Sequence, residues 1–256
     1  MNLCIDVGNT TIGVGFFKEE KLLKRLTFTV ELKKTSDEYE SVIRRTLKEN
    51  DLDAKEISGI ILSSVVPSIS DQMLIALKDV FNVSPLLIAP GIKTGLSIHV
   101  DNPNEIGNDL IADMVGAKEK YGYPCLIVDL GTASKILLID KTGTFTSCVI
   151  MPGLALSLNS LTNNTALLPE VPLKTPKSIM ARNTVEAMNA GVIFGHYDMI
   201  AGAVKRYEKE LGYECKHIIT GGSAVHLKEL LTDDFHYEKN LCLEGLNSIL
   251  RRNEVK

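Results

Sequence analysis

The pattern of apolar and polar positions gives the two halves of the chain similar beginnings. In the first half, an apolar run over residues 3–5 ends at Asp6, a Gly-Asn-Thr-Thr sequence follows, and a second apolar run covers residues 12–17. Short apolar runs on both sides of a turn sequence predict two strands joined by a tight turn. Gly8 can adopt a positive φ at no steric cost, and Asn9 tolerates one better than most residues, so both suit such a turn.

The second half opens on residues 126–140, which repeat this pattern. Asp129 corresponds to Asp6, and Gly131 corresponds to Gly8. Taken alone, the first segment is more typical of an ordinary hairpin with a capped turn. The repeat indicates a duplicated domain with a phosphate-binding turn in each half.

The chemistry of the first turn supports phosphate binding. A turn of this kind points backbone N–H groups and the hydroxyls of Thr10 and Thr11 into one small space, where they can hold a phosphate. Asp6 lies at the end of a buried strand, where an unpaired carboxylate would be costly. We therefore expect Asp6 to hold Mg²⁺, through water, because this ion keeps most of its hydration shell.

The rest of the chain alternates strand and helix patterns. We expect strands at residues 22–30, 59–66, 86–89, 96–100, 144–151 and 216–220. We expect helices at 35–50, 70–81, 105–121, 184–211 and 244–252, a helix of about ten residues after Gly153, and a helix that begins at 224. This order predicts an α/β fold of mixed sheets with helices on their faces. Thr35 and Glu38 form a capping-box pattern at the start of the first helix.

Glycines mark two further segments. Gly221 and Gly222 stand between a predicted strand and a predicted helix, a pattern that brings a ligand close to a helix N-terminus but is weak on its own. Gly191, Gly195 and Gly202 interrupt the longest helical pattern. We interpret these three as positions that allow close packing against another helix, including one across a dimer.

Composition excludes several classes of protein. The 256 residues carry a net charge of −4 with scattered Lys and Arg, so no nucleic-acid partner is expected. The five cysteines are far apart and form no C-x-x-C pair, which argues against a disulfide framework and a zinc site. The apolar runs are too short for a membrane span or a signal peptide, so we expect a cytoplasmic protein without membrane contacts.

Asp109 is the candidate for acid–base chemistry. Phosphoryl transfer needs positioning, charge neutralisation and a group that orients the attacking hydroxyl. Asp109 follows Gly107, where a substrate can approach the backbone. The alternative is that Asp109, like Glu105, only complements the dipole at the start of a helix.

Seven motifs together resemble those of the type III pantothenate kinases. They are DVGNT at Asp6–Thr10, NPNEIGND at Asn102–Asp109, DLGTA at Asp129–Ala133, MPGL at Met151–Leu154, NTVEAMNAG at Asn183–Gly191, TGG at Thr220–Gly222 and LEGL at Leu243–Leu246. The resemblance spans nearly the whole chain. It implies two duplicated ribonuclease H-like domains of the actin-like ATPase superfamily, here 1–122 and 123–256, with ATP between them.

The resemblance also implies an activity and a set of site residues. The activity is ATP-dependent phosphorylation of pantothenate to 4′-phosphopantothenate, the first step of coenzyme A biosynthesis, by a homodimer that uses Mg²⁺ and a monovalent cation, K⁺ or NH₄⁺. The ATP site would comprise Asp6, Val7, Gly8, Asn9, Thr10, Thr11, Ile12, Gly13 and Thr132. The substrate site would comprise Val100, Gly107, Asn108, Asp109, Leu110 and, from the partner subunit, Thr184. Asp109 would be the general base, and Asp129 would bind the monovalent cation.

Some positions depart from the family pattern. Leu110 stands where the family has arginine, and Val100 where it usually has tyrosine. Ser134 and Lys135 replace two threonines, and a Gly-Gly pair is replaced by Ser147 and Cys148. Losing the arginine matters most, because a charge-assisted hydrogen bond contributes about 1.5 to 3 kcal/mol, or roughly tenfold or more in affinity for a carboxylate.

These departures leave two hypotheses. In the first, the protein is a pantothenate kinase in which another cation, Lys135, Arg182 or His99, serves the substrate carboxylate. In the second, it is a paralogue that phosphorylates another small hydroxyl substrate or acts as a non-catalytic, nucleotide-binding regulatory protein. The retention of Asp6, Asp109, Asp129 and Thr184 favours an enzyme, whereas Val100 and Leu110 favour a changed pocket. Of the two hypotheses, we favour the pantothenate kinase.

Overall fold

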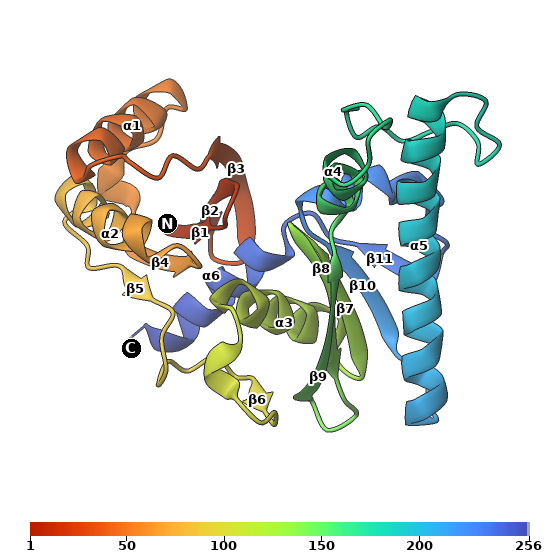
Figure 1. Ribbon diagram of the computed structural model, residues 1–256. Coiled ribbons are helices and arrows are strands. Elements are labelled where there is room, and N and C mark those ends of the chain that lie inside the picture. Colours follow the sequence, from red (N-terminus) through yellow and green to blue (C-terminus); the bar gives the residue numbers. More distant parts are fainter. Residues whose placement is uncertain (255–256) are drawn as a thin grey trace. The chain divides into compact units, whose positions relative to one another are not determined.

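The computed structural model describes residues 1–254 and divides into two compact units. Unit 1 comprises residues 1–96, 101–119 and the segment from Asn240, and unit 2 comprises residues 97–100 and 120–239. Figure 1 shows the elements of both units. The predicted domain limits, 1–122 and 123–256, stay a prediction; the compact units group the C-terminal helix with unit 1.

Unit 1 is built on a mixed sheet of five strands in the order β3-β2-β1-β4-β5. The strands are β1 (Asn2–Val7), β2 (Thr11–Lys18), β3 (Lys21–Thr29), β4 (Gly59–Ser64) and β5 (Leu86–Leu87). The first three are antiparallel neighbours, and β4 and β5 run parallel to β1. The predicted hairpin and third strand are therefore confirmed.

Helices cover both faces of this sheet. The helices are α1 (Ser36–Glu49), α2 (Pro67–Phe81), α3 (Asn108–Tyr121) and α6 (Leu241–Asn253), with short 3-10 turns at Ala54–Glu56 and Pro103–Glu105. Leu3 and Ile5 of β1 pack with α1 and α2, whereas Cys4 packs with α3 and α6. Alternate residues of β1 thus enter two separate cores, as the period of a strand requires.

Unit 2 repeats the topology of unit 1. Its six strands lie in the order β11-β10-β7-β8-β9-β6, and the first five match β5-β4-β1-β2-β3 of unit 1 position by position. The strands are β6 (Ser97–Ile98), β7 (Cys125–Leu130), β8 (Ala133–Ile139), β9 (Thr144–Pro152), β10 (Lys216–Thr220) and β11 (Phe235–Tyr237). The duplication predicted from two similar hairpins is therefore present in the strand order.

Two helices of unit 2, α4 (Leu154–Asn163) and α5 (Thr184–Leu211), pack on its sheet through a shared apolar core. The bounds of α5 agree with the prediction from its periodicity. Within residues 1–254, the three glycines of α5 do not pack against another helix, because a Cβ atom at Gly191, Gly195 or Gly202 would meet nothing within 4 Å.

Several predicted boundaries are wrong, for local reasons. Glu105 ends a 3-10 turn, and α3 begins only at Asn108. Pro67 begins α2, because proline is well suited to the first position of a helix. The predicted helix from Ala224 is two 3-10 turns, Gly222–His226 and Lys228–Leu230, and α6 begins at Leu241. The short strand β11 was not predicted at all.

The capping box of α1 is confirmed. The Glu38 backbone N–H donates to Thr35 Oγ1 at 3.4 Å, and the Thr35 N–H donates to Glu38 Oε2 at 2.8 Å.

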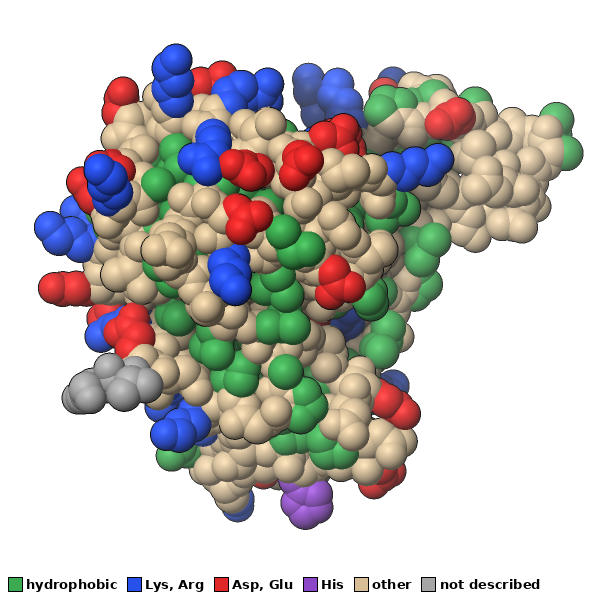
Figure 2. Space-filling model, turned by 90° about the vertical axis from the view of Figure 1, so that its left-hand side faces the viewer, with side chains coloured by type: hydrophobic (Ala, Val, Ile, Leu, Met, Phe, Trp, Pro, Cys, Tyr) green, Lys and Arg blue, Asp and Glu red, His purple; other side chains and the backbone are tan. Residues whose placement is uncertain are grey.

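On the face drawn in Figure 2, Lys and Arg side chains are interspersed with Asp and Glu side chains. No helix within residues 1–254 is long and apolar enough to cross a membrane.

Candidate active site

The first hairpin closes with a tight turn between β1 and β2. The Gly8 N–H donates to the Thr11 carbonyl at 3.0 Å, and the Thr10 carbonyl accepts from the Val30 N–H at 3.0 Å. The predicted positive φ at Gly8 or Asn9 is not present, since both residues have a negative φ or an extended backbone. Space at Gly8 is tight, because a Cβ atom there would lie 3.3 Å from the Thr11 carbonyl oxygen.

The turn exposes polar side chains and buries apolar ones. Asn9, Thr10 and Thr11 are exposed, whereas Val7 and Ile12 are 0% and 4% exposed. The side chains of Val7 and Ile12 therefore belong to the core. Of these two predicted ATP-site residues, only the backbone is available to a ligand.

Asp6 lies near the carboxyl end of β1, between Gly13 on β2 and Ser63 on β4. It shares with Cys4 the face of the sheet that α3 and α6 cover. A Cβ atom at position 13 would make ordinary contacts of 4.0 Å with the Asp6 carbonyl oxygen and Leu243 Cδ2.

The start of α3 lies at the same edge of the same face. Asn108 Nδ2 donates to the Ile88 carbonyl at 3.1 Å, and Ile88 directly follows β5. The Ile88 N–H donates to the Leu62 carbonyl, one residue before Ser63, the partner of Asp6. Asp6 and the first turn of α3 therefore lie at the same height along the strand direction. Across the sheet, β1 and β5 are separated by two strand spacings, about 10 Å.

Asp109 is in this first turn of α3, and its carboxylate folds back over Gly107. A Cβ atom at position 107 would lie 2.4 Å from Asp109 Oδ1, closer than real contacts allow. Gly107 therefore reserves the space that the carboxylate occupies. The sequence placed Asp109 beside this glycine but did not show that the Asp109 carboxylate occupies the place that a Cβ atom at position 107 would take.

A close contact between two helices holds α3 in place. A Cβ atom at Gly245 of α6 would lie 1.8 Å from the Ala112 carbonyl oxygen of α3. A Cβ atom at Gly116 of α3 would lie 2.6 Å from the Leu241 carbonyl oxygen. The LEGL motif is therefore a packing motif, which fixes the helix that carries Asp109.

The second hairpin carries Asp129 on β7. Its neighbours across the sheet are Thr220 on β10 and Lys135 on β8. Lys135 Nζ donates to Asp129 Oδ2 at 2.8 Å, and Asp129 is 7% exposed. The buried carboxylate is thus neutralised by a residue of its own hairpin.

Two motif glycines pack against the turn of the second hairpin. A Cβ atom at Gly153 would lie 2.3 Å from the Thr132 carbonyl oxygen, and one at Gly221 would lie 2.5 Å from the Leu130 N atom. Gly221 also has a φ of +96°, which favours glycine. The MPGL and TGG motifs therefore support the turn. Gly221 is also the N-cap of the 3-10 turn Gly222–His226, so its predicted place at a helix start is confirmed, although the helix is not an α-helix.

Two residues that differ from the family pattern, Ser134 and Ser147, form hydrogen bonds with side chains of α5. Ser134 is fully buried, and its Oγ lies 2.8 Å from His196 Nε2 of α5. Burial lowers the pKa of His196, so its ring is neutral near pH 7. The Ser147 hydroxyl lies 3.0 Å from the Tyr207 hydroxyl, also on α5. Both serines tie the sheet of unit 2 to this helix.

The side chains of the other predicted site residues differ in exposure. Thr184 is the exposed first residue of α5, and the preceding Asn183 caps the helix by accepting from the Glu186 N–H at 2.9 Å. Thr132, Arg182 and His99 are exposed, and Val100 and Leu110 are half-buried.

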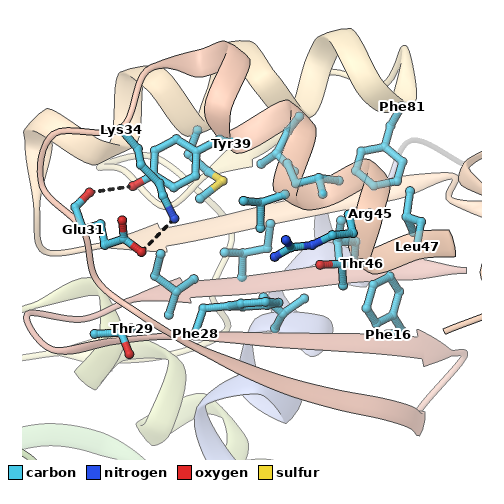
Figure 3. A pocket seen from close by; sticks show the side chains of 18 residues that line it. Phe16, Phe28, Thr29, Glu31, Lys34, Tyr39, Arg45, Thr46, Leu47 and Phe81 are labelled. Carbon is cyan, nitrogen blue, oxygen red and sulfur yellow. Dashed lines mark hydrogen bonds and ion pairs between the residues drawn. The ribbon is translucent and has the colours of Figure 1, made fainter. Parts of the chain in front are cut away.

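A cavity of about 230 Å³ in unit 1 lies away from the predicted site, between the sheet and the helices α1 and α2 (Figure 3). Its wall is mostly apolar, and Lys34 pairs with Glu31 at 2.9 Å on its rim. Ile12 is the single predicted site residue in the wall that the structure describes. This cavity lies on the face of the sheet opposite to Asp6.

Comparisons with known proteins agree with this architecture. The family model of type III pantothenate kinase matches residues 2–206. The type III pantothenate kinase of Exiguobacterium sp. is 37% identical over 254 residues, which cover 99% of this chain and 100% of the relative. That of Listeria innocua is 38% identical, covering 99% of this chain and 98% of the relative.

One solved structure shows the same fold at lower identity. A Campylobacter jejuni protein, provisionally described as a Baf family transcriptional activator, has a TM-score of 0.61 and 20% identity, and the match covers 98% of each chain. At this identity the likeness concerns the fold alone. The family model and the full-length relatives show that the chain belongs to the type III pantothenate kinase family.

Proposed function

We infer that this chain transfers the terminal phosphoryl group of ATP to the hydroxyl group of pantothenate, giving 4′-phosphopantothenate, the first step of coenzyme A biosynthesis. Full-length identity of 37% to a type III pantothenate kinase is the observation that carries this inference. The fold agrees with it, because Asp6 and the first turn of α3 lie at the carboxyl ends of parallel strands, where α/β sheets bind ligands.

In this mechanism the turn at residues 8–11, Asp6 and Asp109 have different roles. The exposed turn at residues 8–11 holds phosphate through N–H groups and the hydroxyls of Thr10 and Thr11. Asp6 would hold hydrated Mg²⁺, and the ion would supply charge neutralisation at the phosphates. Asp109 accepts the proton of the pantothenate hydroxyl while the hydroxyl oxygen attacks the phosphoryl group.

The substrate pocket follows from the position of Asp109. Gly107, Asn108 and Leu110 flank this carboxylate, and we assign them to pantothenate together with Val100. Lys135 is paired with Asp129, whereas the other two candidates for contact with the substrate carboxylate, Arg182 and His99, are exposed. The half-buried Leu110 can contribute only apolar contact there.

A second copy of this chain completes the proposal. Unit 2 exposes large apolar side chains around α4 and the start of α5, namely Leu156, Leu161, Leu167, Ile179, Met180 and Val185. Large exposed apolar patches mark interaction surfaces. We propose that this surface forms a homodimer, which also brings Thr184 to the partner's substrate.

The test of the function is a coupled assay of ADP release with and without pantothenate. Asp109→Asn should lower kcat by about 10²- to 10⁴-fold with folding intact, because the general base is lost. Glu105→Gln is the matched control: it makes the same change on an exposed side chain outside α3 and should leave kcat nearly unchanged. ATP turnover without any dependence on pantothenate would favour the paralogue with another substrate.

The homodimer is tested by sedimentation at micromolar concentration. Met180, which is 80% exposed, is changed to Asp in the apolar surface, and Leu32, 65% exposed in unit 1, is changed to Asp as the control. The first variant should dissociate and the second should not. A wild-type monomer would contradict the proposal.

A further inference from the structure

The buried carboxylate of Asp129 already has a positive partner from the chain itself. Asp129 and Lys135 lie directly opposite each other on β7 and β8, so their side chains share one face of the sheet. The distance from Lys135 Nζ to Asp129 Oδ2 is 2.8 Å, and the two side chains are 18% and 10% exposed. This is a mostly buried, charge-assisted hydrogen bond.

The family resemblance implies that a monovalent cation binds Asp129, and the residues present do not fit that cation. A lysine ammonium is itself a compact single positive charge with three donors. A K⁺ ion at the same carboxylate would have to displace the ammonium, which would then lose its partner in a buried place, or would lie beside it against like-charge repulsion. Either arrangement disfavours the ion.

The sequence difference supplies the reason. The family usually has threonine at position 135, and a neutral hydroxyl leaves the carboxylate opposite without a positive charge. A buried carboxylate needs such a charge, which a dissolved cation can supply. A lysine at this position supplies the positive charge as part of the chain, so no ion has to be bound from solution.

We propose that the Lys135 ammonium replaces the monovalent cation at Asp129, so that this kinase works without K⁺ or NH₄⁺. Lys135 acts through Asp129 and is therefore a positioning residue. The activity part of this proposal rests on the proposed function, whereas the binding part does not.

The binding part is tested by thermal unfolding, because a specific ion that binds only the folded state raises Tm in a saturable way. Wild-type protein should have the same Tm in KCl and in choline chloride at equal ionic strength. Lys135→Thr should gain a Tm increase that is specific to KCl. Lys18→Thr, a change on the exposed end of β2, is the control and should behave as wild type.

The activity part compares the same proteins in both salts. Wild-type turnover should differ by less than about twofold, whereas Lys135→Thr should be activated by K⁺ more than about tenfold. Activation of the wild type by more than about tenfold would overturn the proposal, as would a folded Lys135→Thr that stays inactive or independent of K⁺. Absence of pantothenate-dependent turnover in every protein would instead overturn the proposed function, and the Tm comparison would still decide the binding part.

Discussion

Adding a single methyl group at Gly107 tests whether the position of the Asp109 carboxylate controls catalysis. A Cβ atom at Gly107 would lie 2.4 Å from Asp109 Oδ1, while the next atoms, Asp109 Cγ and Leu110 Cγ, are at 3.5 and 3.8 Å. Gly107 has no positive φ, so alanine fits the backbone. The carboxylate is therefore the group that has to move.

The structure gives the size of the effect. Restoring an ordinary contact from 2.4 Å requires the Asp109 oxygen to move by about 1 Å, and a displacement of that size costs roughly 10²-fold in rate, or about 2.7 kcal/mol in activation free energy. Stability should change by less than about 1 kcal/mol, because alanine restricts the unfolded chain and the displaced side chain is flexible.

The assay is a double-mutant cycle on kcat for pantothenate-dependent ADP release, with urea denaturation of each protein. Gly107→Ala should lower kcat strongly in the wild-type background and hardly at all in the Asp109→Asn background, since the two residues act as a unit. Equal losses in both backgrounds, or an unchanged kcat in the single variant, would refute the assignment of Asp109 as the base held by Gly107.

Two predictions concern stability. Gly245→Ala would place a Cβ atom 1.8 Å from the Ala112 carbonyl and should cost about 3 kcal/mol or more by urea denaturation, whereas Gly202→Ala, with open space around it, should cost nothing. Burial lowers the pKa of His196, so as pH falls the His196 ring takes up its proton in the unfolded chain at a higher pH than in the folded protein. The free energy of unfolding should therefore decrease as pH drops below about 6.5. His196→Gln, which can still bond to Ser134, should flatten that slope between pH 7 and 5; an unchanged slope would show that other groups cause it.

Local sequence information determined the elements and their repetition. The hairpins, the capping box of Thr35 and Glu38, and the long helix α5 follow from periodicity and short-range hydrogen bonds, which act between residues close in sequence. The doubled Asp-x-Gly pattern also predicted the duplication that the two strand orders contain. The choice of Asp6 and Asp109 as site candidates came from the same local patterns and the family motifs.

Only the tertiary structure decided why the motif glycines are needed. Gly153, Gly221 and Gly245 each leave room for the backbone of an element far away in sequence, and no local pattern contains that distance. The same holds for the pair of Lys135 with Asp129: strand register sets them opposite each other, and burial makes their charges depend on one another. Periodicity depends on neighbours along the chain, whereas close backbone approach and charge pairing depend on neighbours in space.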